Sequence, residues 1–156
     1  MVKRHYNFAE YDSKKQARAF IAGQPVSLKF SNEMCRELKG MHMKKAEAYL
    51  KRVSEMKDFL PLRVYSGKVA HRKGNSKSFV KAGRYPIRLA KVFLGLLNLV
   101  KANADFKGLD SDNLKIIHTF CSQGFRKTGY QTRGRISGKR HRHKSTHLEV
   151  VVEEAS

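Results

Sequence analysis

The feature that most constrains this chain is the distribution of its charge. Two stretches, residues 59–104 and 113–148, contain ten and nine Lys or Arg residues and no Asp or Glu. Together they hold nineteen of the 33 basic residues and none of the 13 acidic ones. A one-signed field of this size repels itself and destabilises a compact state. We therefore expect a polyanionic partner, and a net charge of +20 makes nucleic acid the leading candidate.

A long basic segment separates two strand-like segments, residues 114–121 and 148–153. The gap of about 26 residues far exceeds the usual hairpin loop of two to five. The segment is rich in Gly, Arg, Lys and His and cannot build a core of its own. If it extends both strands outward, each arm has about eleven residues and projects about 35 Å. Such a ribbon is marginal in water and becomes stable when phosphates surround it.

We call this segment, residues 122–147, the basic finger, and it is the most specific functional signal in the sequence. Its cations are predicted to contact phosphates, and Tyr130 or an Arg plane can stack on bases. The alternatives are a solvated, disordered loop or a nuclear-import signal. The predicted phosphate contacts are Arg126, Lys127, Arg133, Arg135, Lys139, Arg140, Arg142 and Lys144.

The first half of the chain predicts a polar arm followed by a folded body. Residues 1–24 suggest a loosely ordered N-terminal arm, and residues 25–154 suggest a single α+β domain. Alternation over residues 26–30 predicts a half-buried strand. A helix then begins at about Ser31, with Glu33 and Glu37 in its early turns, where carboxylates favour the positive end of the helix dipole.

Two further helices follow in the predicted domain. Periodicity resumes after Gly40 and predicts a helix through about Met56. Residues 61–85 have no sustained period and predict a basic loop. Pro86 then opens a long helix that ends near Gly108.

The sequence offers little support for catalysis or metal binding. Asp105, Asp110 and Asp112 fit a helix stop and turn better than a nuclease metal site. The histidines of the finger show no paired-ligand spacing of a known zinc module. Cys35 and Cys121 are expected to be buried thiols of a reducing compartment rather than a disulfide. We predict no enzyme activity, no cofactor and no metal.

The order of these segments along the chain is similar to that of a known protein family. The chain resembles the universal large-subunit ribosomal protein family called twenty-two in bacteria and seventeen in eukaryotes, in its archaeal and eukaryotic form. The motifs that carry the resemblance are GMHMKKAEAYLKRV (40–53), ANADFKGLDSDNLKI (102–116), RGRISGK (133–139) and STHLEVVV (145–152).

The resemblance implies a small antiparallel three-stranded sheet packed on helices, with a long β-hairpin that lines the nascent-peptide exit tunnel. Its hairpin tip would be Arg133, Gly134 and Arg135. Further contacts to ribosomal RNA on the body would be Lys44, Lys45, Arg63, Arg72, Lys73 and Arg84.

The implied partners are large-subunit ribosomal RNA, neighbouring ribosomal proteins and the nascent polypeptide, without a membrane or a homo-oligomer. The N-terminus has no apolar core of the kind a secretory signal needs, so we expect a cytoplasmic location, with nucleolar assembly if the source is eukaryotic. Two other classes share the charge: a DNA-compacting architectural protein and an RNA-processing enzyme. The first would show an apolar wedge at the finger tip or a dimerising face, and the second would cleave RNA in the presence of Mg²⁺.

Overall fold

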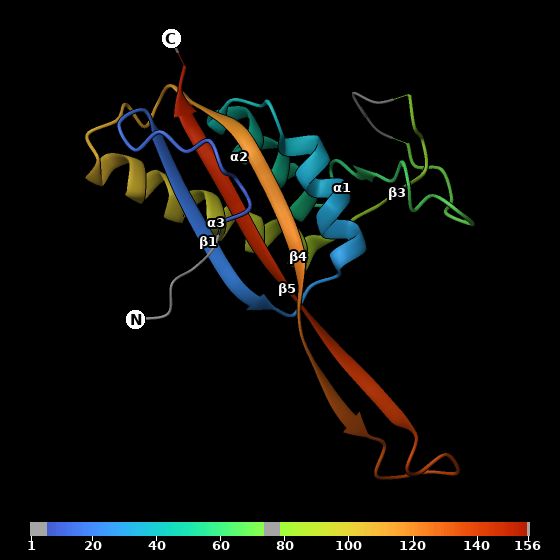
Figure 1. Ribbon diagram of the computed structural model, residues 1–156. Helices are drawn as coiled ribbons and strands as arrows, with labels where there is room; N and C mark the ends of the chain where they lie inside the picture. Colours follow the sequence, from blue (N-terminus) through green and yellow to red (C-terminus); the bar gives the residue numbers. More distant parts are fainter. Residues whose placement is uncertain (1–5, 74–78, 156) are drawn as a thin grey trace.

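Figure 1 shows the computed structural model of the chain, which describes residues 6–73 and 79–155. Three long strands form an antiparallel sheet: β1 (Gln16–Gln24), β4 (Leu114–Tyr130) and β5 (Arg140–Glu154). Their spatial order is β1-β5-β4, so β5 is the central strand. The predicted α+β class and the three-stranded antiparallel sheet are therefore confirmed.

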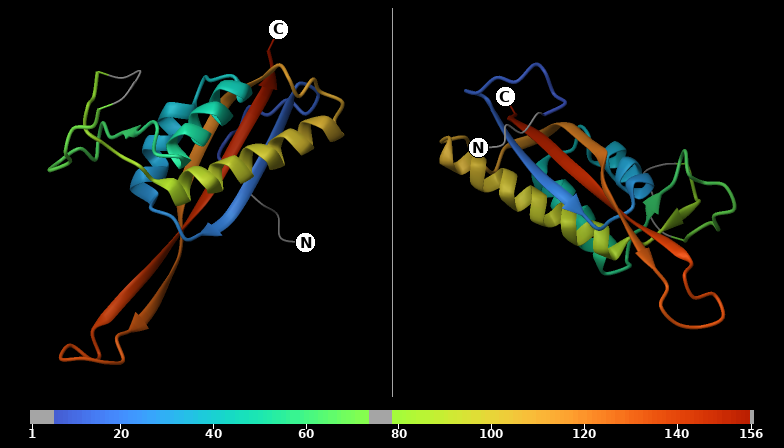
Figure 2. Two further views of the ribbon diagram at one scale, coloured as in Figure 1. Left: turned by 180° about the vertical axis from the view of Figure 1, so that it is seen from behind. Right: turned by 60° about the horizontal axis from the view of Figure 1, so that its bottom comes forward.

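Helices α1 (Leu28–Leu38), α2 (Met43–Ser54) and α3 (Ile87–Phe106) cover one face of this sheet (Figure 2). The core forms between them because every second residue of β5 points toward the helices. Leu148, Val150 and Val152 are fully buried, as are Leu97 and Val100 of α3. Burying one such side chain contributes about 1.5–3 kcal/mol. None of the helices in the described part of the chain combines the length and hydrophobicity needed to span a bilayer.

The opposite face of the sheet is covered by the N-terminal segment, residues 6–12. The backbone N–H of Asn7 donates to both carboxylate oxygens of Glu149 at 3.1 Å. His118 Nε2 lies 3.0 Å from the same carboxylate, and Phe8 packs on the His118 ring with centroids 5.1 Å apart. These contacts explain how Glu149, on the side of β5 that faces away from the helices, is only 3% exposed.

Two predictions for the first thirty residues are wrong. Residues 16–24 form edge strand β1 instead of a loosely ordered arm, and residues 26–30 form no strand. Ala17 and Ala19 of β1 are buried on the side of the helices, where α3 packs across them. Alanine is a poor strand former, so the alternating positions of Ala17 and Ala19 gave little indication of a β-strand. The apolar residues at 26, 28 and 30 lead instead into α1, because three alternating positions do not separate a strand from a helix.

The other helix predictions are confirmed, with small shifts of their ends. Gly40 separates α1 from α2 with φ of +81°, a conformation that favours glycine. Its N–H donates to Ile116 O, which ties this turn to the free edge of β4. Pro86 precedes α3, and Gly108 follows it with φ of +75°. Asp110 accepts hydrogen bonds from the N–H of Asp112 and the amide of Asn113, as expected for a turn.

The basic loop is closed at its base by a small second sheet of β2 (Leu60–Pro61) and β3 (Gly83–Arg84). Gly83 is required there because an added Cβ would collide with the buried ring of Phe59. Residues 62–73 and 79–82 form no helix and project from the body beside α1 (Figure 1). The predicted loop is therefore correct, although its ends are paired as short strands.

Candidate nucleic-acid interface

The basic finger is a continuation of strands β4 and β5 beyond the body (Figure 1). The two strands remain paired antiparallel out to Tyr130 and Arg140. The register shifts between Gln123 and Arg126, at the root of the finger. Gly124 lies in this shift, where an added Cβ would come within 2.5 Å of Ser145 Oγ. A larger residue would therefore displace the Ser145 side chain, which donates to Phe125 O. The extended strands predicted for this segment are present.

The pairing register places four of the five Lys and Arg residues of the paired arms on one side of the ribbon. Arg126 lies opposite Lys144, Thr128 opposite Arg142, and Tyr130 opposite Arg140. Because side chains alternate along a strand, these residues all project from the same face. The other face holds Lys127 with His141 and His143. We call the set Arg126, Arg140, Arg142 and Lys144 the cationic face.

The finger has no means of stabilising this charge internally. No residue from 122 to 145 is buried, and Phe125 and Tyr130 are 80% and 66% exposed. In the described chain, none of the eight cations predicted to bind phosphates makes an ion pair; Arg126 donates to the neutral amide of Gln123. Like charges directly opposite each other on paired strands are destabilising. A polyanion that fits between the side chains of this face would remove that repulsion.

The finger ends in a loop, residues 131–139, that contains the predicted tip. Gly138 N–H donates to Gln131 O, and Ser137 N–H donates to Gly134 O. Gly134 and Gly138 have φ of +90° and +81°, so glycine is needed for the turn at both places. Arg133 and Arg135 flank Gly134 and are exposed in this loop. The loop therefore presents two guanidinium groups beyond the last paired residues.

Several cations predicted to bind RNA on the body have partners within the protein. Arg63 forms an ion pair with the buried carboxylate of Glu37 at 2.5 Å, and its side chain is 34% exposed. Lys44 is paired with Asp112 at 3.1 Å, although both side chains are mostly exposed. An exposed pair of this kind contributes about 0–1 kcal/mol and can exchange for a phosphate. Arg63 is thus the least available of the predicted contacts.

The remaining body candidates are divided between the basic loop and α2. Arg72 and Arg84 both donate to the carbonyl of Gly83, and Arg72 also lies over the Tyr85 ring. Lys73 and Lys45 are exposed. The basic loop and the finger extend from the body in different directions (Figure 2). The structure therefore does not gather the predicted contacts into one patch, and a single RNA would have to wrap the body to meet them all.

Two carboxylates that hold the basic loop were misinterpreted from the sequence. Glu33 and Glu37 do not lie in the first turn of α1, which begins at Leu28, so they do not act on the helix dipole. Glu33 is 1% exposed and accepts the backbone N–H groups of Val64 and Tyr65. Glu33 and Glu37 are four residues apart and lie on the side of α1 that carries buried Met34. This spacing could have predicted that both carboxylates face the interior.

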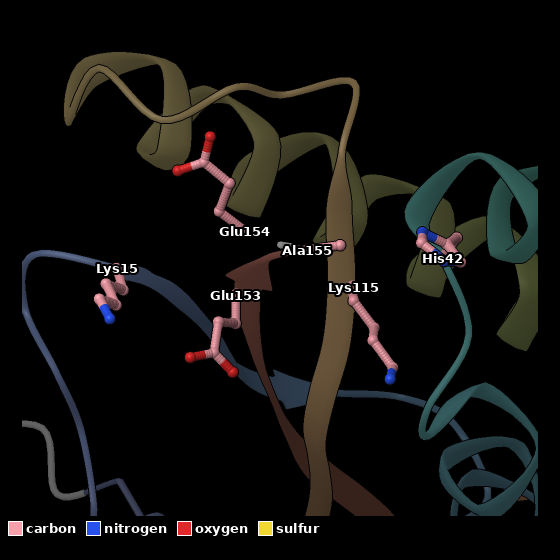
Figure 3. Close-up of a pocket in the computed structure, with 6 residues that line it drawn as sticks. All are labelled: Lys15, His42, Lys115, Glu153, Glu154 and Ala155. Atoms are coloured by element: carbon pink, nitrogen blue, oxygen red, sulfur yellow. The ribbon is translucent and has the colours of Figure 1, made fainter.

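A cleft of about 630 Å³ lies where β4 and β5 end in the body, away from the finger. Figure 3 shows Glu153 between Lys15 and Lys115, with His42 across the cleft. Cations and carboxylates are mixed here, so the cleft lacks the one-signed charge of the finger. Across residues 6–73 and 79–155, no three His, Cys, Asp or Glu side chains gather as metal ligands would.

The protein combines a small α+β body with a β-ribbon whose cationic side chains lie mainly on one face and make no ion pairs within the described chain. These features define a class of nucleic-acid-binding protein. Comparison with known proteins narrows this class. Residues 19–153 match the family model described as ribosomal protein L22p/L17e. The chain belongs to this family, as the resemblance of its motifs predicted.

Curated relatives from archaea agree with this assignment. The large ribosomal subunit protein uL22 of Ignicoccus hospitalis is 43% identical over 155 residues, 96% of each chain. The uL22 protein of Hyperthermus butylicus is 37% identical over 153 residues, again 96% of each chain. That of Methanococcus aeolicus is 36% identical over 156 residues and 99% of each chain.

Proposed function

We propose that the basic finger anchors this protein in large-subunit ribosomal RNA. The chain is a structural constituent of the large ribosomal subunit rather than an enzyme, consistent with its family and archaeal relatives. It binds ribosomal RNA, lies among neighbouring ribosomal proteins and works in the cytoplasm. The observation that supports a role for the finger in particular is its unpaired charge: eight exposed cations without a carboxylate.

The mechanism is charge neutralisation combined with shape. Each cation set against a phosphate releases condensed counterions, which makes the affinity depend steeply on salt. Arg140 and Arg142 can each form two parallel hydrogen bonds to one phosphate. Tyr130 lies on the same face and offers an exposed ring on which a base can stack. Phosphate contacts of this kind position the protein without reading sequence.

The finer proposal concerns the end of the finger. By the family resemblance, Arg133, Gly134 and Arg135 would lie at the wall of the nascent-peptide exit tunnel. The exposed loop 131–139 supports this, because it presents two exposed guanidinium groups beyond the last paired residues of the arms. The protein then acts as a single copy in each subunit, and a nascent polypeptide would be its third kind of partner.

The test of the finger is the salt dependence of binding to in vitro transcribed large-subunit RNA. Changing Arg126, Arg140, Arg142 and Lys144 to Ala should make the plot of log affinity against log salt shallower by about three. The matched control changes Lys14, Lys51, Lys91 and Lys101 to Ala, which removes the same charge from the body. An unchanged slope in the first variant would exclude the cationic face from the interface. An equal loss in the control would show that the finger contributes no more than other surface cations.

The tip is tested separately in assembled ribosomes. A photo-activatable residue in place of Arg133 should crosslink to a stalled nascent chain. The same group in place of exposed Lys51 on α2 should not. Crosslinks from Arg133 to RNA alone would remove the tunnel assignment while leaving RNA binding intact.

A further inference from the structure

The two cysteines of the chain come from different elements that pack against each other at the root of the finger. Thr119 Oγ1 of β4 donates to the carbonyl of Cys35 on α1 at 2.8 Å. Cys121 Sγ, two residues further along β4, lies 3.1 Å from Asn32 Oδ1. Asn32 is three residues before Cys35 and therefore on the same face of α1. One face of the strand and one face of the helix thus bring the thiols together.

The thiols are shielded from solvent, and Cys121 Sγ also lies 4.0 Å from the carbonyl of Leu28, on the same face of α1 as Asn32 and Cys35. Cys35 and Cys121 are 6% and 5% exposed. The neighbouring thiol is the leading cause that raises the pKa of Cys35 well above its usual value and lowers that of Cys121. Burial adds to the rise at Cys35 and opposes the fall at Cys121. Each thiol therefore lies in the electrostatic environment of the other.

A metal does not account for this pair. Zinc in proteins takes four ligands, or three with an open position. No third His, Cys, Asp or Glu gathers with the two thiols among the residues that the structure describes. Two neighbouring thiols without further ligands can be oxidised to a disulfide.

We propose that Cys35 and Cys121 are a redox-active dithiol that forms an intramolecular disulfide by exchange with a small-molecule disulfide such as oxidised glutathione. The Cys121 thiolate attacks one sulfur of oxidised glutathione, forms a mixed disulfide and releases one glutathione thiolate. Cys35 then loses its proton and attacks Cys121 Sγ, which releases the second glutathione. The protein loses two electrons and two protons, and the oxidant becomes two thiols.

The position of the bond gives it a structural effect. Cys121 lies two residues before Gln123, where the β4–β5 register begins to shift and the finger leaves the body. A covalent link to α1 at this place would fasten the last buried part of β4 to the helix layer. In the reduced protein, β4 and α1 are joined here by the weaker hydrogen bonds of Thr119 to Cys35 O and of Cys121 to Asn32. Oxidation would therefore stiffen the root of the finger without touching its cations.

The experiment uses the full-length protein, fully reduced and then equilibrated with mixtures of oxidised and reduced glutathione. One series is run on the folded protein and one during refolding, so that burial of the thiols cannot hide the reaction. Free thiols are alkylated in denaturant, and the intact mass is measured. The expected product has lost two hydrogen atoms, accepts no alkyl group and yields a linked peptide pair containing Cys35 and Cys121.

The controls are Cys35→Ser and Cys121→Ser, each checked for folding by circular dichroism. Each should accept glutathione as a mixed disulfide only at a ratio of oxidised to reduced glutathione at least tenfold higher than the wild type needs for its internal bond. The oxidised wild type should also melt at a higher temperature, and a reductant should abolish the difference. Two alkylated thiols in both series, mixed disulfides alone, or links only between molecules would overturn the proposal.

Discussion

Strands β4 and β5 run through two environments, and the contrast is clearest along one face of β5. In the body this face carries Leu148, Val150 and Val152, all fully buried under the helices. In the finger the same alternation carries Arg140, Arg142 and Lys144, all exposed. The change occurs at Thr146, which is buried and donates to Val26 O. The backbone pairing of β4 with β5 is similar before and after Thr146. The two regions therefore differ in whether helices cover this face of β5.

The comparison teaches that a strand pair alone does not determine whether a hairpin is stable. Two strands without a hydrophobic face are marginal in water. The body solves this with an apolar layer of helices, and the finger leaves its face to a partner outside the chain. A row of cations attracts a phosphate backbone. In the same way, a row of Leu and Val packs against the apolar side of α3.

Hydrogen exchange gives the largest expected difference between the two regions. In the free protein, amides of residues 126–130 and 140–144 should exchange at least a thousandfold faster than those of Val150 and Leu97, because only the body requires global unfolding to open. Bound ribosomal RNA should slow exchange in the finger. The measurement is exchange followed by mass spectrometry, with and without RNA. Equal protection in the free protein would contradict the comparison.

A matched pair of substitutions on β5 gives the next effect. Leu148→Ala should lower the free energy of unfolding by about 3 kcal/mol, because it opens a cavity between β5 and the helices. Arg142→Ala, on the same face in the finger, should change it by less than about 0.5 kcal/mol. Denaturant unfolding of the free protein measures both. A large loss from Arg142→Ala would mean that the finger contributes to the stability of the body.

The smallest effect tests a polar contact of the body. Tyr49 donates its hydroxyl to Phe59 O at 3.2 Å, and burial, with Glu37 and Asp58 nearby, raises the pKa of Tyr49 above its ordinary value of 10.0. Because the folded state favours the neutral phenol, this contribution is complete below pH 10 and is lost as pH rises through the raised pKa.

Tyr49→Phe should therefore cost about 1 kcal/mol at pH 7, where it leaves the Phe59 carbonyl without its donor. The difference in the free energy of unfolding between this variant and the wild type should be smaller by about 1 kcal/mol at pH 11 than at pH 7. Unfolding by denaturant at the two pH values measures this. The gap would stay constant if Tyr49 titrated normally. Exchange rates in the finger, compared at one pH, should be the same in both proteins.

The predictions from sequence succeeded where a residue type permits few conformations. Gly40 and Gly108 mark helix ends because their positive φ suits glycine, and the spacing of Leu89, Phe93, Leu96 and Val100 fits only a helix. The basic finger was identified because its 26 residues contain too few apolar side chains to form a core and must therefore lie outside one. In each case, local chemistry decided the structure.

The failures came from positions where a distant partner decides. Ala17 and Ala19 form a strand because β5 pairs with β1 and α3 needs small residues across it, and neither partner is visible in the local sequence. Glu33 is buried because residues 64 and 65 bring their N–H groups to it. Arg63 was predicted to contact RNA because its ion pair with Glu37 is not visible in the local sequence. The individual phosphate contacts depend on a partner in the same way and remain predictions.

The strand order has a consequence for how the molecule is made. β5 lies in the middle of the sheet, yet it follows every other element along the chain. During synthesis, β1 and the inner part of β4 must wait without a neighbour until β5 emerges to join them. Such late, distant pairing slows folding and leaves apolar edges open to aggregation. A newly made chain would thus pass through a vulnerable interval, during which a chaperone or early docking onto RNA would be of greatest benefit.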